Sequence, residues 1–234
     1  MKAVILNSGI GSRMGILTEN NHKSMVEIKD GITLIEHQII TLREAGIGKI
    51  VITTGHMESK IKEYLDCKFN DINIQYIYNP RYLDTNYIYS IYLSLNKLNE
   101  DIVLLHGDLY FDRDILELII KSKESCVVVD SMLPLPEKDF KAQILGDRVT
   151  EIATYINGDD CISCQPLYKL KIQDWKVWGK QITKFCEEGK VNVYAEEALN
   201  EVLEKIELRP LDIEGRLCME VDTIEDLNLL KSKL

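Results

Sequence analysis

Short apolar runs alternate with amphipathic segments through the first half of the chain, and this alternation restricts the fold more than any other feature. Residues 4–7, 50–53 and 101–105 are rich in aliphatic side chains, which is typical of strands buried on both faces. Residues 33–45 and 58–65 carry apolar side chains at helical spacing. The pattern predicts an α/β fold with a mostly parallel mixed sheet and helices on both faces.

The second half of the chain is less regular. We expect a small antiparallel set of strands there, because Gly146-Asp147 is a favourable hairpin turn. The 234 residues contain no low-complexity tract or internal repeat, and we expect a single domain over residues 1–234. The remaining expected elements are strands at 72–78, 125–130, 141–145, 149–154, 161–168 and 218–221, and helices at 87–98, 173–188, 196–205 and 224–230, the last capped by Thr223 or Asp222.

The charge balance restricts the class of partner. Lys and Arg total 28 and Asp and Glu total 38, so the formal net charge is −10. We therefore expect no binding to nucleic acid and none to a membrane, since both surfaces are anionic. A polyanionic ligand would have to meet a local group of cations or a metal ion. The sequence does not decide the oligomeric state, and a homodimer is one state that we consider.

Cysteine and histidine give no separate signal. The six cysteines are scattered and no export signal precedes them, so we expect reduced thiols in the cytoplasm. Cys161 and Cys164 have the spacing of metal ligands, but a second ligand pair is missing, and we interpret them as structural. We interpret the histidines as structural too, since His37 falls within an expected helix, His56 follows an expected strand and His106 stands beside Asp108.

The first expected strand runs into a glycine-rich loop with a cation, in which Gly9, Gly11 and Arg13 stand close together. Glycines let the backbone N–H groups approach an anion, and arginine suits a phosphate. The dinucleotide fingerprint is excluded because Met14 occupies the place of its third glycine, and a P-loop is excluded because Gly11 is not followed by Lys.

Three further side chains complete a pattern suited to a nucleotide. Lys23 lies ten residues after Arg13, and together with the loop it would clamp a triphosphate. Asp108 and Asp222 each follow the end of an expected strand, where open α/β sheets bind ligands. Two such carboxylates can hold one Mg²⁺, which prefers oxygen ligands and substrate phosphates.

The order and spacing of these motifs resemble a known family. The loop of residues 6–15, Lys23, Asp108 and the late Glu-Val-Asp-Thr of residues 220–223 are similar to nucleotidyltransferases of the nucleotide-diphosphosugar pyrophosphorylase superfamily. Residues 78–92 resemble the bacterial phosphocholine cytidylyltransferase group, which includes the 2-aminoethylphosphonate and phosphoglutamine cytidylyltransferases. The resemblance implies a Rossmann-like α/β domain, CTP as donor, Mg²⁺ as cofactor and release of pyrophosphate.

The resemblance also assigns roles to residues. Arg13 and Lys23 would be catalytic and bind the triphosphate, and Asp108 and Asp222 would bind Mg²⁺, with Asp108 also in the nucleotide site. The chain departs from the family pattern at Asn7-Ser8, where alanines are usual, and at His22, where proline is usual. The other implied nucleotide contacts are Leu6, Asn7, Ser8, Gly9 and Gly11 in the loop, and Asn86 and Ser90 facing the cytosine.

The acceptor is less strongly implied. Tryptophans of the phosphocholine enzymes are missing near Gln165 and after Tyr194, and we interpret Trp175 and Trp178 as packing residues. The polar and acidic set that remains suits an amine or amino-acid head group, so we rank phosphoglutamine and 2-aminoethylphosphonate ahead of phosphocholine. Such products would serve cell-surface polysaccharide decoration, for example of a capsule. The alternatives are a sugar-1-phosphate nucleotidyltransferase and a non-catalytic nucleotide-binding domain. The candidate acceptor contacts are Gln165, Tyr194, Glu196 and Glu197.

Overall fold

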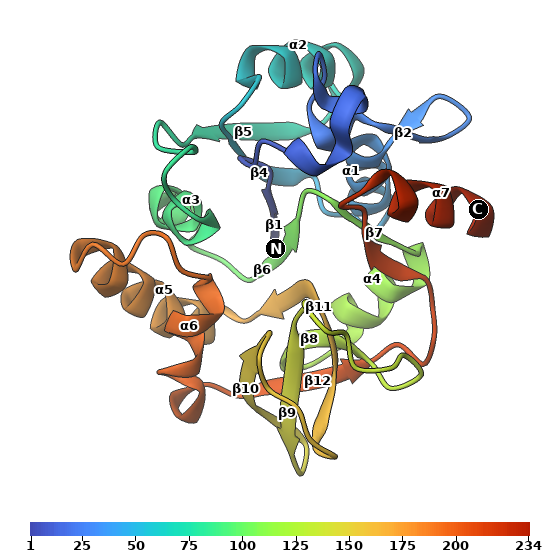
Figure 1. Cartoon of the computed structure of the whole chain (residues 1–234). Helices are drawn as coiled ribbons and strands as arrows, with labels where there is room; N and C mark the ends of the chain where they lie inside the picture. Colours follow the sequence, from blue (N-terminus) through green and yellow to red (C-terminus); the bar gives the residue numbers. More distant parts are fainter.

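The computed structural model describes residues 1–234, and strands from both halves of the chain join one nine-stranded sheet (Figure 1). Its main path runs in the order β10-β9-β11-β6-β1-β4-β5, while β8 pairs with β11 and β12 pairs with β8. The strands are β1 (Lys2–Leu6), β4 (Lys49–Thr54), β5 (Asn73–Tyr78), β6 (Ile102–His106), β8 (Ser125–Asp130), β9 (Lys141–Leu145), β10 (Arg148–Ala153), β11 (Cys161–Leu170) and β12 (Leu208–Asp212).

The two halves of the sheet differ in strand direction. β1 pairs in parallel with both β4 and β6, so that Ile5 lies opposite Ile52 on one side and Leu105 on the other. β11 pairs antiparallel with β6, β8 and β9. The expected mixed α/β sheet is confirmed, and the small antiparallel set lies in the second half as predicted.

Helices cover both faces of the sheet, as the buried strands require. In β1 the side chains of Ala3 and Ile5 enter one hydrophobic cluster, and those of Val4 and Leu6 enter the other. The first cluster contains residues of α1 (Leu34–Glu44), α2 (Glu58–Lys68) and α4 (Arg113–Lys121). The second contains residues of α3 (Tyr87–Ser94), α5 (Ile172–Glu187) and α6 (Ala195–Asn200), which lie together on the left in Figure 1.

A small two-stranded sheet beside the main one brings the end of the chain back to its middle. β13 (Cys218–Glu220) pairs antiparallel with β7 (Leu109–Phe111), and the Val221 N–H donates to the Asp108 carbonyl at 2.8 Å. α7 (Ile224–Lys233) follows, and Thr223 caps it through a capping box, as expected. The remaining short elements are β2 (Glu27–Lys29), β3 (Ile32–Thr33) and the 3-10 segments Ser12–Thr18, Lys23–Met25, Leu95–Lys97 and Leu203–Lys205.

Some element boundaries differ from the sequence-based expectation. The apolar patterns of the sequence did not indicate α4 or β12. The helix expected over 87–98 is α-helical only to Ser94, and that expected over 196–205 only to Asn200; a 3-10 turn follows each. Helices often tighten in this way at their last turn.

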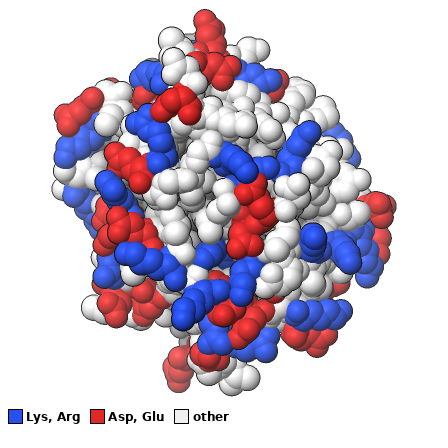
Figure 2. All heavy atoms as spheres, turned by 180° about the vertical axis from the view of Figure 1, so that it is seen from behind, with Lys and Arg blue, Asp and Glu red and all other residues white.

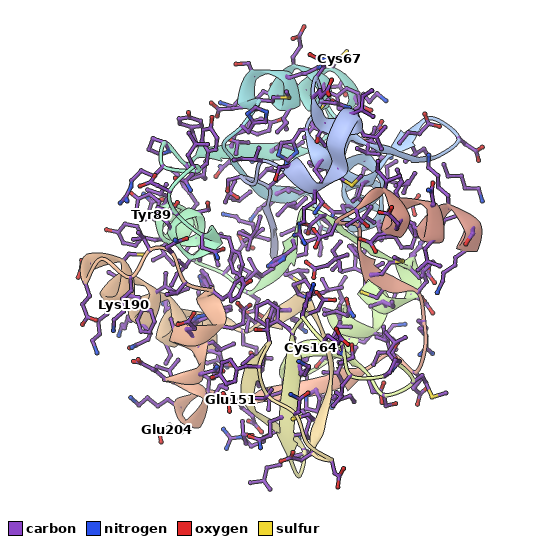
Figure 3. All side chains as sticks on the ribbon, in the orientation of Figure 1. Cys67, Tyr89, Glu151, Cys164, Lys190 and Glu204 are labelled. Carbon is purple, nitrogen blue, oxygen red and sulfur yellow. The ribbon has the colours of Figure 1, made fainter.

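The side chains outside the site agree with the structural interpretation given above. All six cysteines are free, and Cys164 lies in the interior whereas Cys67 lies on the outer surface of α2 (Figure 3). Trp175 and Trp178 are fully buried packing residues, as expected. Figure 2 shows Lys and Arg interspersed with Asp and Glu on the face seen from behind. None of the helices is long and apolar enough to cross a membrane.

Candidate active site

The site lies where two neighbouring parallel strands end. Leu6 is paired with His106 at the ends of β1 and β6, and the Gly107 N–H donates to the Leu6 carbonyl at 2.9 Å. The glycine-rich loop follows β1, and Gly107-Asp108 follows β6. Because β1 pairs with β4 on one side and with β6 on the other, this is the carboxyl edge of the sheet at its switch point, the usual ligand site of open α/β sheets.

Two glycines allow the loops to approach each other closely. Gly11 has φ 71°, and a Cβ atom built on it would lie 2.6 Å from Cβ of Lys23. A Cβ atom on Gly107 would lie 2.4 Å from Oδ1 of Asn7. Position 11 therefore needs glycine, because of its backbone conformation and the crowding, whereas a side chain at Gly107 would require the buried Asn7 side chain to move.

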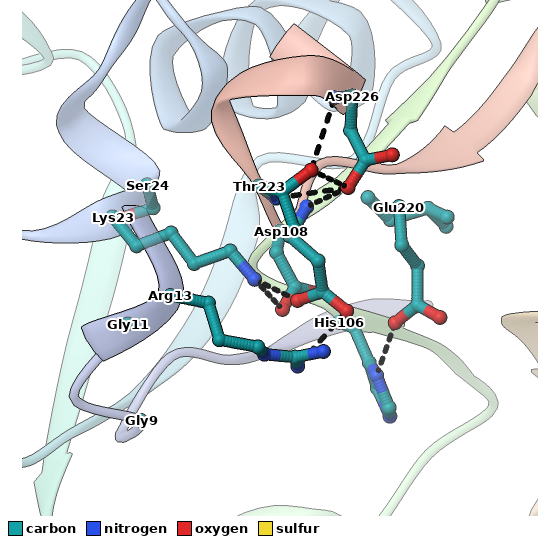
Figure 4. Close-up of polar contacts among 12 residues, drawn as sticks. Gly9, Gly11, Arg13, Lys23, Ser24, His106, Asp108, Glu220, Thr223 and Asp226 are labelled. Atoms are coloured by element: carbon teal, nitrogen blue, oxygen red, sulfur yellow. Dashed lines mark hydrogen bonds and ion pairs between the residues drawn. The ribbon is translucent and has the colours of Figure 1, made fainter. Parts of the chain in front are cut away.

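Four charged side chains from distant parts of the chain meet at this edge (Figure 4). Nζ of Lys23 lies 2.8 Å from Oδ2 of Asp108 and also contacts Oδ1 of Asp222. The guanidinium of Arg13 lies 2.9 Å from Oδ2 of Asp222. The Lys23 side chain is only 9% exposed, whereas that of Arg13 is 68% exposed. The structure thus brings the predicted cations and the predicted metal ligands together.

The charges of this group stabilise one another. Burial, the largest single effect, would lower the pKa of Lys23, but the charges and hydrogen bonds of Asp108 and Asp222 together outweigh it and raise that pKa. Burial would raise the pKa of Asp108, but the charge of Lys23, assisted by His106, lowers it. Lysine and aspartate are therefore both ionised at neutral pH.

His106 contributes a further charge beside Asp108. Its Nδ1 lies 3.1 Å from Oε1 of Glu220, and its ring stands edge-on to Tyr87 at 4.7 Å (Figure 4 shows the contact with Glu220). Burial would lower the pKa of His106, but the hydrogen bond and charge of Glu220 raise it to about 9. The geometry makes His106 an ion-pair partner within the site, whereas His37 bonds the Phe111 carbonyl at 2.9 Å outside it.

A cavity of about 220 Å³ adjoins the charged group. Of the predicted nucleotide contacts, Leu6, Ser8, Gly9, Asn86, Ser90 and Asp108 line it. A smaller adjoining space contains Asn7 and Lys23. Six further residues that line the cavity were not expected from the sequence: Asn79, Tyr82, Thr85, Tyr87, His106 and Asn192. The first four fall in residues 78–92, the segment that carries part of the family resemblance, and His106 lies two positions before Asp108, whereas Asn192 has no local signal.

Some predicted base contacts are already engaged in the fold. The Ser90 hydroxyl lies 2.6 Å from that of Ser8 and accepts from the Asn79 amide at 3.0 Å. Oδ1 of Asn86 caps α3 by accepting from the Tyr87 N–H at 2.7 Å. These residues shape the cavity wall, and their contacts with a base stay a prediction.

The predicted acceptor residues occupy two different environments. Glu196 is 2% exposed, and its carboxylate accepts hydrogen bonds from the Tyr168 hydroxyl at 2.9 Å and from the Tyr87 hydroxyl. It therefore lies behind the two tyrosines, whereas we expected it at the cavity surface. The reason is that both carboxylate oxygens satisfy buried hydroxyl donors. Glu197 accepts from the Tyr194 N–H at 3.3 Å at the start of α6.

Tyr194 packs on Phe140, and Gln165 follows Cys164, which bonds to the same residue. The rings of Tyr194 and Phe140 are 5.1 Å apart, and the Phe140 carbonyl accepts from the Cys164 N–H. Gln165 lines a second cavity of about 730 Å³. That cavity extends from the charged group along the loop after β8, and its wall includes Arg13, residues 133–139, Ser163, Cys164, Gln165, Glu220, Asp222, Thr223 and Asp226.

This fold, with a glycine-rich loop, two cations and two strand-end carboxylates around a cavity, defines a nucleotidyltransferase. The family model described as MobA-like NTP transferase domain matches residues 3–132, and the chain belongs to this family.

Relatives match over almost the whole chain. The choline-phosphate cytidylyltransferase of Streptococcus pneumoniae is 25% identical over 100% of this chain and 98% of its own length. The CTP:phosphoglutamine cytidylyltransferase of Campylobacter jejuni is 27% identical, covering 98% of each chain. The solved CTP:phosphocholine cytidylyltransferase from Streptococcus pneumoniae superposes with a TM-score of 0.79 at 23% identity, covering 99% of this chain and 98% of the other. These findings confirm the predicted family.

Proposed function

We propose that the protein is a CTP-dependent cytidylyltransferase that transfers CMP to a small phosphorylated or phosphonate acceptor and releases pyrophosphate. The observation that carries this proposal is the meeting of Lys23 and Arg13 with Asp108 and Asp222 at the edge of a cavity of about 220 Å³. The names of the two near-full-length relatives support CTP as the donor.

The reaction requires positioning and charge neutralisation more than a base. An oxygen of the acceptor phosphoryl group attacks the α-phosphorus of CTP, the new O–P bond forms, and the bond from the α-phosphorus to the bridging oxygen breaks. The electron pair of that bond leaves on pyrophosphate. An ionised phosphate is already a nucleophile, so Lys23 and Arg13 would act by stabilising negative charge on the transferring group.

The carboxylates fit a divalent cation. Oδ1 of Asp108 is buried and has no hydrogen-bond partner in the chain, and Asp222 faces the same lysine. Carboxylate oxygens are the ligands that Mg²⁺ prefers, so Asp108 and Asp222 would hold it. Bound there, Mg²⁺ would supply further charge neutralisation for the phosphates.

We propose an acceptor with a positively charged head group, because negative charge and aromatic rings gather beside the site. The rings of Tyr87 and Tyr194 are 5.9 Å apart, and the carboxylate of Glu196 lies behind Tyr87. A primary amine can donate hydrogen bonds to this polar surface, whereas choline needs a larger aromatic box. We therefore place phosphoglutamine and 2-aminoethylphosphonate ahead of phosphocholine, for decoration of a cell-surface polysaccharide.

A pyrophosphate-release assay tests the proposal. Each of CTP, UTP, GTP and ATP is combined with Mg²⁺ and with phosphoglutamine, 2-aminoethylphosphonate, phosphocholine or glucose 1-phosphate. We expect CTP with an amine-bearing acceptor to give the highest kcat/KM. Preference for a sugar phosphate would favour a sugar-1-phosphate nucleotidyltransferase, and nucleotide binding without turnover would favour a binding domain. A higher kcat/KM for phosphocholine would overturn the acceptor ranking only.

A further inference from the structure

His22 is buried between two segments of the proposed nucleotide site. One is the glycine-rich loop, and the other is the 3-10 turn Lys23–Met25, which carries the lysine of the charged group. His22 is 3% exposed, and the chemistry described above gives it no role. A buried polar ring needs partners for both nitrogens, and these partners show what it connects.

The two ring nitrogens bond to the two segments. Nε2 lies 2.9 Å from the carbonyl oxygen of Gly9. Nδ1 lies 3.3 Å from the backbone nitrogen of Ser24 and 2.9 Å from its hydroxyl. A backbone N–H can only donate, so Nδ1 accepts, and the hydrogen of the neutral ring is on Nε2, which donates to Gly9.

This bond fixes the direction of one peptide group in the loop. The chain has no cis peptide bonds, and in a trans peptide the C=O and N–H point in opposite directions. Since the Gly9 carbonyl is held toward His22, the Ile10 N–H points away from it. No hydrogen bond within the chain uses the Ile10 N–H. Free N–H groups of a glycine-rich loop are the donors that bind phosphate oxygens.

His22 directly precedes Lys23 in the chain, and the Lys23 ammonium contacts Asp108 and Asp222. Gly11 adds a second contact between the segments, since its Cα approaches the Lys23 side chain too closely for any Cβ. The loop N–H groups and the lysine ammonium are therefore both located relative to His22.

We propose that His22 is a positioning residue for nucleotidyl transfer. It holds the glycine-rich loop against the Lys23 turn, so that the loop N–H groups and the Lys23 ammonium meet the same triphosphate. The inference rests on the proposed function, which supplies that triphosphate. Burial, the largest effect, lowers the pKa of the His22 ring to about 4, so the neutral form that this bond requires is present at physiological pH.

His37 offers a matched control. Its Nε2 also bonds a backbone carbonyl at 2.9 Å, that of Phe111, and its ring stacks on Tyr110 at 4.4 Å. His37 lies in α1, and neither its hydrogen bond nor its ring stacking involves the glycine-rich loop. Removing either ring deletes a largely buried histidine and its carbonyl bond, but only one deletion releases the loop.

The test compares His22→Ala, His22→Gln, His22→Asn and His37→Ala by steady-state kinetics, thermal unfolding and hydrogen–deuterium exchange of residues 7–15. A glutamine amide can reach the place of Nε2, whereas an asparagine amide mimics Nδ1. We expect His22→Ala to lower kcat by about 10- to 100-fold, more than it raises KM for CTP. Exchange in the loop should rise in this variant, and His22→Gln should restore both properties.

His37→Ala should lower the unfolding temperature but keep kcat within about threefold. Equal losses of kcat in His22→Ala and His37→Ala would overturn the inference. So would unchanged loop exchange in His22→Ala, or rescue by asparagine without rescue by glutamine. If the wild-type protein turns over no CTP with any acceptor, the proposed function fails, and the inference, which needs a triphosphate, fails with it; loop exchange then shows only whether His22 holds the loop.

Discussion

Nζ of Lys23 lies 2.8 Å from Oδ2 of Asp108, although the two residues are 85 positions apart in the chain. The same ammonium also contacts Asp222, 199 positions away. A nearly buried lysine is therefore held by the two carboxylates that we propose as metal ligands. In this arrangement an ammonium and a divalent cation compete for the same two carboxylates.

This competition predicts the effect of Lys23→Met on metal binding. Without the ammonium, Asp108 and Asp222 lose a positive neighbour, and their affinity for a divalent cation should rise by about tenfold or more. Titration of nucleotide-free protein with Mn²⁺, followed by electron paramagnetic resonance, measures this directly. Lys49→Met, at an exposed ion pair with Glu100, is the control and should leave the affinity unchanged. Weaker binding in Lys23→Met would contradict the competition.

Lys23→Ala should also reduce turnover. If the lysine stabilises charge that develops on the α-phosphate, kcat should fall by about 10²-fold or more while KM for CTP changes less. Initial rates at saturating acceptor over a range of CTP concentrations separate the two parameters. A raised KM with normal kcat would make Lys23 a clamp for the ground state only.

Asp108→Asn and Asp222→Asn should each lower kcat by about 10²-fold or more in the folded protein, because each removes a charged ligand of the proposed Mg²⁺ site. Asparagine keeps the size of the side chain, and circular dichroism checks that the fold is retained. Rates should be compared at several Mg²⁺ concentrations. Near-normal turnover at saturating Mg²⁺ in either variant would remove that residue from the metal site.

The parts of the site that the sequence could predict are those set by local chemistry. Gly11 is needed at a positive φ, and Asp108 and Asp222 follow strands whose apolar composition predicts where they end. Thr223 was one of two residues expected to cap the last helix, and the structure gives it a capping box. Such features depend on a few neighbouring residues.

The features that could not be predicted depend on contacts between distant segments. No local pattern shows that Glu196 will accept hydrogen bonds from Tyr87 and Tyr168, or that Asn192 will line the cavity. β12 contains Pro210, which normally argues against a strand; it is tolerated here because β12 pairs with β8 alone, at a sheet edge.

Two glycines of the loop should respond differently to alanine. A Cβ atom on Gly11 would lie 2.6 Å from Cβ of Lys23 at φ 71°, so Gly11→Ala should destabilise the fold by about 1–3 kcal/mol. A Cβ atom on Gly9 would meet no atom within 4 Å. Gly9→Ala should therefore keep the unfolding temperature but raise KM for CTP by about tenfold, if phosphates approach that backbone. Urea unfolding and initial rates measure both effects, and an unchanged KM in Gly9→Ala would contradict the predicted contact.

The lowered pKa of His22 predicts that the free energy of unfolding falls as the solution becomes more acidic. Burial lowers this pKa to about 4 in the folded protein, from an ordinary value of 6.5. Between these values the unfolded chain binds more protons, so the stabilisation is complete above the ordinary pKa and is lost as pH falls toward the folded one. The free energy of unfolding lost over this pH range is about 3 kcal/mol, which follows from the difference between the two pKa values.

His22→Gln has no proton to bind at this position, so its free energy of unfolding should lack this part of the pH dependence. Urea unfolding measures the free energy of unfolding of both proteins. Between about pH 7 and about pH 4, the wild type should lose up to about 3 kcal/mol more of this free energy than His22→Gln does. Groups such as His37, whose pKa burial also lowers, are present in both proteins and cancel in the difference. A difference that does not change with pH would show that His22 titrates normally in the folded state, contrary to its buried position between Gly9 and Ser24.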